Sequence, residues 1–247
     1  MAAQRNWTRP EQLLALDLYL SLPFGRLNKS TAEIVAVANA IKRTPSSVAM
    51  KACNFASLDE SFTSTGRKGL EGASASDRAL WNEFLEDRDQ LVEEMESRVD
   101  EAPPVEKVLR RPEGPTEVAG TVRQRRGQGF FSRVVRSAYE EKCAVTGLAV
   151  PSLNVASHII PWASDEARRT DPTNGLLLSA LVDRAFDRGL VTFDEQSRLI
   201  CGRPLMVPDA KAMALLSLQG TPLRPPEKFQ PDPAALAWHR EHWASNF

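Results

Sequence analysis

Cysteine and histidine are scarce in this chain of 247 residues, which contains 3 residues of each type. Cys53, Cys143 and Cys201 are too few and too scattered for a disulfide framework or a four-cysteine zinc site. No apolar run approaches the ~18 residues that a membrane span requires, and the N-terminus lacks an apolar signal core. We therefore expect a soluble cytoplasmic protein in a reducing compartment, with no membrane partner.

An excess of either charge is also lacking. The chain has 31 Lys and Arg against 32 Asp and Glu, a net charge of −1, so the overall charge gives no indication of a nucleic-acid partner. One local stretch differs, because residues 121–138 contain no acidic residue but hold Arg123, Arg125, Arg126, Arg133 and Arg136. Charge alone leaves two interpretations open, a solvated helix face or contact with a phosphate backbone.

The length of the chain allows one or two domains with a sizeable core, since 42% of the residues are hydrophobic. Between residues 101 and 120, proline and glycine interrupt any helical or strand periodicity of apolar residues, and most of the other residues that separate them are charged or small. This composition is typical of a linker. We predict a first domain over residues 1–100, a linker over 101–120 and a second domain over 121–247.

Three helix starts are predicted in the first domain. Thr8 and Glu11 have the spacing of a capping box, and Ser30 and Glu33 repeat that spacing before a helix predicted over Ile34–Ile41. A third helix begins after Thr44-Pro45, which places a capping residue before a proline in the first turn, and runs towards Asn54.

The second and third of these helices have the spacing of a helix-turn-helix. In that case Lys51, Ser46 and Ser47 would be candidate contacts to a DNA groove. A small three-helix core shows the same pattern, so a purely structural bundle remains the alternative.

An apolar stripe at helical spacing follows in an acidic segment. It consists of Leu80, Trp81, Phe84, Leu85, Leu91, Val92, Met95 and Val99. The stripe requires an apolar partner, either the preceding helices or a second copy of itself in a homodimer.

The second half of the chain mixes helices with short strands. Helices are predicted over Phe130–Glu141, Ala180–Asp187 and Pro233–Trp243, a strand over Leu153–Ile160 and an apolar return over Asn174–Leu178. Leu190–Phe193 and Arg198–Cys201 flank turn residues and predict a hairpin. The fold class is therefore α+β, with an all-α N-terminal domain.

His158 stands at the end of a predicted strand, where a side chain can face a cleft. An isolated histidine is more often structural, but this one precedes an Asn174-Gly175 pair and two acids. Asp183 and Asp187 are four residues apart and share one helix face, so together they can hold a hard divalent cation.

At these residues the sequence resembles the HNH, or ββα-metal, endonucleases, in a restriction-endonuclease-like branch. The resemblance is carried by SHIIPW at residues 157–162, DPTNGLLL at 171–178 and DRAFDRGL at 183–190, and extends over roughly 121–247. Residues 1–100 resemble, less specifically, a helical module found ahead of such nucleases. The implied architecture is a helix-turn-helix-like domain, a linker and a C-terminal HNH ββα-metal nuclease domain.

The resemblance implies a role for each matching residue. His158 corresponds to the general base, Asn174 to the residue that fixes the backbone around it, and Asp183 to a metal ligand. Asp187 is a candidate second ligand, and Ser157 stands where many members have a stronger ligand. These oxygen donors favour a hard metal over zinc, with Mg²⁺ first and Mn²⁺, Co²⁺ or Ni²⁺ as alternatives.

Such a constellation suits hydrolysis of a phosphodiester. A base activates the attacking water, and a cation stabilises the leaving oxygen. We therefore expect a metal-dependent endonuclease of double-stranded DNA in restriction or phage defence, with the arginines at 123–136 on the DNA backbone. One such site cuts one strand, so double-strand cleavage requires a homodimer.

Two other functions remain open. The chain could be a DNA-binding protein whose degenerate HNH domain does not cleave, because Ser157 and Asp183 fail to hold metal. It could also be a structural protein that uses the apolar stripe.

Further polar side chains around the motif have two interpretations each. Arg168, Arg169, Arg184 and Arg188 could clamp phosphates or neutralise neighbouring acids. His239 and His242 could approach the metal, but packing or surface hydrogen bonding is the favoured reading. Cys53 and Cys201 are expected to be small buried hydrophobes.

Overall fold

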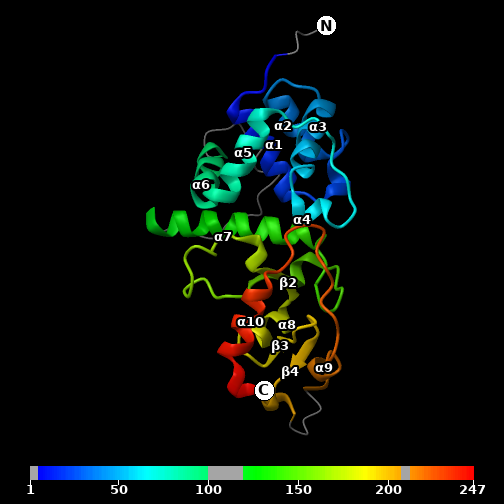
Figure 1. The fold of residues 1–247 in the computed structure, drawn as a ribbon, viewed down its shortest axis with the longest axis vertical. Coiled ribbons are helices and arrows are strands. Elements are labelled where there is room, and N and C mark those ends of the chain that lie inside the picture. Colours follow the sequence, from blue (N-terminus) through cyan, green and yellow to red (C-terminus); the bar gives the residue numbers. More distant parts are fainter. Residues whose placement is uncertain (1–4, 100–118, 207–211) are drawn as a thin grey trace. The chain divides into compact units, whose positions relative to one another are not determined.

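The computed structural model describes residues 5–99, 119–206 and 212–247, without the side chains of residues 97–99 and 119–126. The described chain forms two units, Met1–Phe130 and Phe131–Phe247, shown in Figure 1. The linker predicted over 101–120 lies outside the described residues, except that its last two residues begin a helix.

The first unit is helical. Its elements are α1 (Arg9–Ser21), η1 (Phe24–Arg26), α2 (Ala32–Ala40), α3 (Pro45–Ala56), α4 (Glu60–Thr63), α5 (Ala75–Glu86) and α6 (Arg88–Val99). Helix α1 lies at the centre, because it packs against α2, α3, α5 and α6. Its apolar side chains Leu13, Leu16 and Leu20 are buried.

Two of the three predicted helix starts are confirmed. The Glu11 carboxylate accepts a hydrogen bond from the Thr8 N–H (3.1 Å), and Thr44 Oγ1 accepts one from the Ser47 N–H (3.2 Å). The capping box at residues 30–33 is wrong. Helix α2 starts at Ala32 instead, and the Glu33 carboxylate accepts from Arg26 (2.8 Å) rather than from the backbone at residue 30.

The apolar stripe at residues 80–95 finds its partner inside the same unit. Leu80, Trp81, Phe84 and Leu91 are buried where α5 and α6 pack on each other and on α1, whereas Leu85 is exposed. The preceding helices are thus the partner of the buried part of the stripe. Val99 lies outside the residues whose side chains are described.

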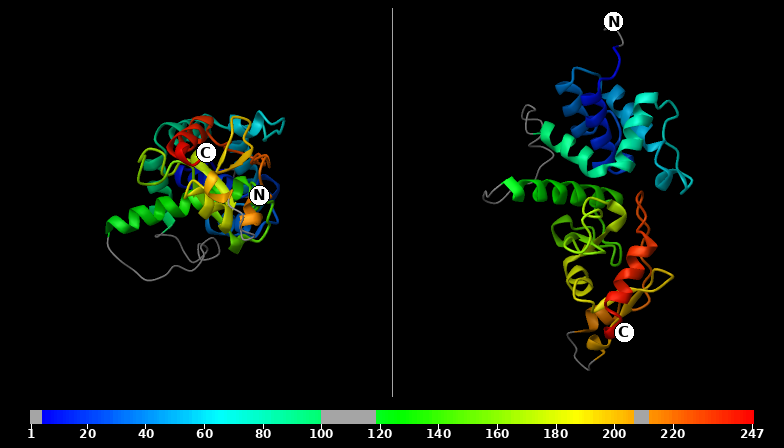
Figure 2. Two further views of the ribbon diagram at one scale, coloured as in Figure 1. Left: turned by 90° about the horizontal axis from the view of Figure 1, so that it is seen from below. Right: turned by 60° about the vertical axis from the view of Figure 1, so that its left-hand side comes forward.

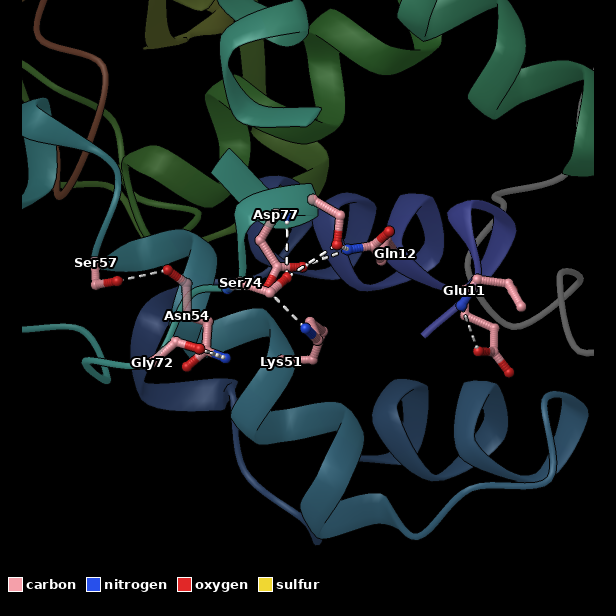
Figure 3. Close-up of polar contacts among 10 residues, drawn as sticks. Glu11, Gln12, Lys51, Asn54, Ser57, Gly72, Ser74 and Asp77 are labelled. Carbon is pink, nitrogen blue, oxygen red and sulfur yellow. Dashed lines mark hydrogen bonds and ion pairs between the residues drawn. The ribbon is translucent and has the colours of Figure 1, made fainter. Parts of the chain in front are cut away.

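Lys51 is buried in the first unit and does not face solvent. Its Nζ donates to the fully buried carboxylate of Asp77 (2.7 Å), which also accepts from Gln12 (2.7 Å) and from the Ser74 N–H (2.8 Å). Figure 3 shows this cluster between α1, α3 and α5. The prediction that Lys51 contacts a DNA groove is therefore wrong, because the ammonium group neutralises Asp77 inside the core.

The second unit combines helices with two small antiparallel sheets. Its elements are the C-terminal part of α7 (Ala119–Ala138), η3 (Pro151–Leu153), β1 (Asn154–His158), η4 (Pro172–Asn174), β2 (Gly175–Ser179), α8 (Ala180–Phe186), β3 (Val191–Phe193), β4 (Leu199–Cys201), η5 (Arg203–Leu205), α9 (Met213–Leu216), α10 (Pro233–His242) and η7 (Ala244–Asn246).

Helix α7 starts and ends earlier than the helix predicted over Phe130–Glu141. It stops at Ala138 because Glu140 and Glu141 adopt positive φ angles of 51° and 60°. The Glu141 N–H then bonds back to the Arg136 carbonyl (2.9 Å), which closes the helix end.

The first sheet and α8 form a ββα arrangement. Strand β1 pairs with β2 in antiparallel register, with Ser157 opposite Leu176 and His158 opposite Gly175. Helix α8 follows β2 directly and packs against both strands. Leu176, Leu177 and Leu178 are fully buried, so β2 forms the centre of this unit.

The predicted hairpin and last helix are confirmed. Strands β3 and β4 pair antiparallel, and α10 packs against β3, as can be followed in Figure 2. The fold class is α+β as expected from the sequence. Within the described ranges no helix combines the length and the apolar character needed to cross a membrane.

Candidate active site

His158 is the last residue of β1 and is half-buried. Its imidazole lies flat against the ring of Phe131 on α7, with ring centroids 3.6 Å apart and 10° between the planes. The ring of Trp162 meets it edge-on at 5.6 Å. These contacts leave the imidazole few orientations.

The hydrogen bond of His158 assigns the proton on its ring. Nε2 lies 3.0 Å from the carbonyl oxygen of Arg169. A carbonyl only accepts, so Nε2 carries the hydrogen and the neutral ring keeps its lone pair on Nδ1. Burial lowers the pKa of His158 below its usual value, which the Arg169 carbonyl and the charge of Asp187 offset in part. The ring is therefore neutral, and Nδ1 basic, at pH 7.

Asn174 holds together the backbone that follows His158. Its side-chain oxygen accepts from the Ile160 N–H (2.8 Å), and its Nδ2 donates to the carbonyls of Ile160 (3.0 Å) and Arg168 (3.3 Å). The Asn174 carbonyl also accepts from the Ile159 N–H (2.9 Å). One buried amide thus ties the end of β1 to the loop that carries the carbonyl of Arg169.

Two arginines anchor that loop. Arg168 forms an ion pair with Asp232 (2.6 Å), the N-cap residue of α10, and a second with Asp165 (3.6 Å). Arg169 donates to the Trp162 carbonyl (3.0 Å) and pairs with Glu166 (3.0 Å). The sequence left open whether these arginines clamp phosphates or neutralise acids. In the structure both of them pair with nearby acids.

Asp183 and Asp187 lie one turn apart at α8. Burial, followed by the charge of Asp187, raises the pKa of Asp183 against the opposing effects of Ser157 and Arg184. Burial likewise raises the pKa of Asp187 against the charges of Arg184, His158 and Arg188. Helix α8 packs against β1, and the charges of Asp187 and His158 each shift the pKa of the other.

Ser157 is buried on the side of β1 that faces Asp183. Its hydroxyl is near enough to lower the pKa of that carboxyl, but among the described residues Oγ has no well-aligned hydrogen-bond partner. A buried hydroxyl without a firm partner beside a carboxylate is chemically suited to a cation or an ordered water.

The donor set fits a hard divalent cation held partly by water. Across the described ranges no group of three His, Cys, Asp or Glu side chains is arranged as metal ligands. Mg²⁺ needs fewer, because it commonly binds through one or two carboxylates and completes its shell with water and substrate phosphate. Asp183 and Asp187, with Ser157 beside them, meet that requirement.

A comparison with known protein families finds a match within this part of the chain. Residues 143–194 match the family model of the HNH endonucleases. This HNH segment contains β1, β2, α8 and β3, and with them His158, Asn174, Asp183 and Asp187. No curated protein matches the chain.

The residues predicted to contact nucleic acid differ in what the structure shows of them. Arg123, Arg125 and Arg126 belong to α7, but their side chains lie outside the described residues. Arg133 is half-buried on the same helix, and Lys51 is buried as described above. By contrast, Arg184 and Arg188 expose their side chains beside the two aspartates, so they are available to a phosphate.

Two participants of the site were not predicted from the sequence. Phe131 carries no motif, because an apolar residue on a helix indicates only a buried face. The carbonyl of Arg169 has no side-chain signature at all. The signal that could have pointed to the Phe131 contact is Gly175, the first residue of β2, because a glycine in a strand often marks the close approach of another segment.

His239 is structural, as expected from the sequence. It is buried against Phe186, with Nε2 donating to the Phe186 carbonyl (3.1 Å) and Nδ1 accepting from Thr192 Oγ1 (2.9 Å). His242 is exposed and stacks on Trp238. Burial lowers the pKa of His239 to about 4, so the folded chain resists protonation there.

This shift predicts a loss of stability in acid. The folded pKa lies below the unfolded one, so the stabilisation is complete above pH 6.5 and is lost as the pH falls towards 4. Chemical denaturation across that range should show a loss of about 3 kcal/mol in the free energy of unfolding from this group. In His239→Gln that pH-dependent part should vanish, whereas His242→Gln should retain it. An unchanged pH profile in His239→Gln would contradict the assignment.

Proposed function

We propose that the chain is a metal-dependent DNA endonuclease that hydrolyses phosphodiester bonds with His158 as general base. The observation that carries the proposal is the HNH segment itself, a ββα unit with an imidazole at the end of β1 and two carboxylates at α8. Family membership of this segment supports a nuclease, and the local geometry supports the roles.

The base acts through Nδ1. Because Nε2–H is bound to the Arg169 carbonyl, Nδ1 is the ring nitrogen that can take a proton from water. Protonation at Nδ1 would give an imidazolium, whose positive charge the Arg169 carbonyl stabilises through its hydrogen bond with Nε2–H. Asn174 keeps this carbonyl at its place by binding the same loop.

The carboxylates of Asp183 and Asp187 would hold the divalent cation, with Mg²⁺ as the first choice and Mn²⁺, Co²⁺ or Ni²⁺ as alternatives. When bound, the cation supplies positive charge for the scissile phosphate and its leaving oxygen. Besides burial, the charge of Asp187 raises the pKa of Asp183, and a bound cation would offset this repulsion between the two carboxylates.

The substrate proposed is double-stranded DNA. Arg184 and Arg188 are exposed at α8 and would contact the phosphates nearest the acids, while Arg123, Arg125, Arg126 and Arg133 would contact the backbone further away. A double-strand break requires two copies of the site, so a homodimer on DNA and a role in restriction or phage defence complete the proposal.

Neutral replacements of the two acids test the metal site. We expect Asp183→Asn and Asp187→Asn each to lose plasmid cleavage and to weaken Mg²⁺ or Mn²⁺ binding measured by calorimetry, because one charge of the pair is gone. Glu195→Gln, an exposed acid in the β3–β4 turn, serves as the control and should behave like the unchanged chain.

The same assay separates cleavage from simple binding. If the unchanged chain shifts DNA in gels but leaves plasmid supercoiled with Mg²⁺, Mn²⁺, Co²⁺ and Ni²⁺, the chain is a DNA-binding protein with a degenerate HNH domain. If cleavage occurs and both aspartate variants bind metal as before, the ligand assignment is wrong while the nuclease stands.

A further inference from the structure

The stack of Phe131 on His158 is closer and flatter than an ordinary aromatic contact. Aromatic pairs usually keep their ring centroids 4.5–7 Å apart in offset or edge-to-face geometry. Here the centroids are 3.6 Å apart and the planes differ by 10°. One whole face of the imidazole is therefore covered by a ring that is itself only 1% exposed.

Gly175 provides the space for this stack. It lies opposite His158 in the register of β1 and β2. A Cβ at Gly175 would come within 2.4 Å of Val135 Cγ2 and 2.9 Å of Phe131 Cζ. Val135 follows Phe131 by one turn of α7, so any larger residue at position 175 would push α7 away from the end of β1.

The stack and the hydrogen bond together restrict rotation of the imidazole. A half-turn of the imidazole about its Cβ–Cγ bond exchanges Nε2 with Cε1 and Nδ1 with Cδ2. That turn would break the bond between Nε2 and the Arg169 carbonyl and would remove the basic nitrogen from its position. A flat ring against one face and the Trp162 edge against another oppose intermediate orientations.

We propose that Phe131 is a positioning residue of the nuclease site, whose ring fixes the plane of His158 so that Nε2–H stays on the Arg169 carbonyl and Nδ1 stays available to water. The proposal rests on the proposed function, in which His158 is the base. It adds α7, which lies outside the HNH segment, to the catalytic apparatus.

The test compares Phe131→Leu with Phe193→Leu in the full chain. Both phenylalanines are buried in the second unit, but Phe193 packs on Phe186 and not on His158. We expect Phe131→Leu to lower kcat for plasmid nicking by about 10²-fold, the cost of misplacing a reacting group by roughly 1 Å, with KM unchanged. Phe193→Leu should lose stability but keep its kcat. Phe131→Met, whose flexible unbranched side chain fills irregular spaces, is the second variant if the leucine variant fails to fold.

A spectroscopic readout follows the ring itself. The ring protons of His158, assigned with His158→Asn, should resonate upfield in the unchanged chain because they lie over the Phe131 face. In Phe131→Leu these signals should move downfield, and the ¹⁵N shifts recorded above pH 8 should lose the pattern of a single Nε2–H tautomer. His239 should keep its signals, because its stack is on Phe186.

The outcomes distinguish the two proposals. If His158→Ala cleaves DNA as well as the unchanged chain, the base is wrong and the role of Phe131 falls with it. If His158→Ala is inactive while Phe131→Leu shows displaced signals and full kcat, the nuclease stands and the positioning role is overturned. Unmoved His158 signals in Phe131→Leu would also overturn it, whether or not any cleavage is observed.

Discussion

His158→Ala is expected to lower the rate of DNA cleavage by about 10²–10⁴-fold, the contribution of a positioned general base. Folding and DNA binding should remain, because among the described residues the imidazole makes one hydrogen bond, through Nε2, and lies at the end of a short strand. Plasmid cleavage, a gel shift and thermal unfolding measure the three properties. His242→Ala, which removes an exposed imidazole, is the matched control.

The pH profile sharpens this prediction. A general base works in its unprotonated form, so cleavage should fall on the acid side as His158 takes up a proton. Because burial lowers the pKa of His158, this loss should set in below the usual histidine value of about 6.5. The raised pKa values of Asp183 and Asp187 add a second loss in acid, since protonated carboxyls do not hold a cation. A profile that rises towards low pH would be incompatible with these roles.

Asn174→Ala is expected to remove both activity and stability. The amide satisfies the N–H and the carbonyl of Ile160 in a place where the side chain is 1% exposed. Leaving two buried backbone groups without partners costs about 2–6 kcal/mol in the free energy of unfolding. The Arg168 carbonyl loses its bond as well, so the loop that fixes His158 is released and cleavage should fall by about 10²-fold.

Asn174→Asp helps to separate the two effects. An aspartate keeps the acceptor for the Ile160 N–H but removes both donors, so it should recover part of the stability and little of the activity. Urea unfolding and plasmid cleavage at a temperature where both variants are folded provide the comparison. Full activity in Asn174→Ala would show that the loop holds its conformation without the amide.

Local chemistry explains which parts of the fold could be predicted. Capping at Thr8 and Thr44 acts within three residues, so the sequence alone locates the starts of α1 and α3. The strand, short return and helix of the ββα unit likewise carry their signal in nearby residues. The capping box at residues 30–33 failed because Thr31, not Ser30, is the N-cap of α2, and because Arg26 holds the Glu33 carboxylate that the box required.

The residues of the candidate site also divide into those that can be recognised in the sequence and those that cannot. His158, Asn174, Asp183 and Asp187 have chemical types and spacings that a reader of the sequence can recognise. Phe131, the carbonyl of Arg169 and the burial of Lys51 have none. An apolar side chain, a backbone oxygen and a lysine each look ordinary until the partner is known, and those partners lie 27, 11 and 26 positions away along the chain.

The amino-acid sequence by itself determined that this chain carries helices before a small α+β unit, and which imidazole, amide and acids belong to its motif. The tertiary structure alone decided that a phenylalanine from α7 lies against the imidazole, and that Lys51 neutralises Asp77 within the core. The physical reason is the separation along the chain over which each interaction acts. Capping and periodicity act between neighbours in the chain, whereas stacking, desolvation and buried ion pairs depend on which distant segments the fold brings into contact.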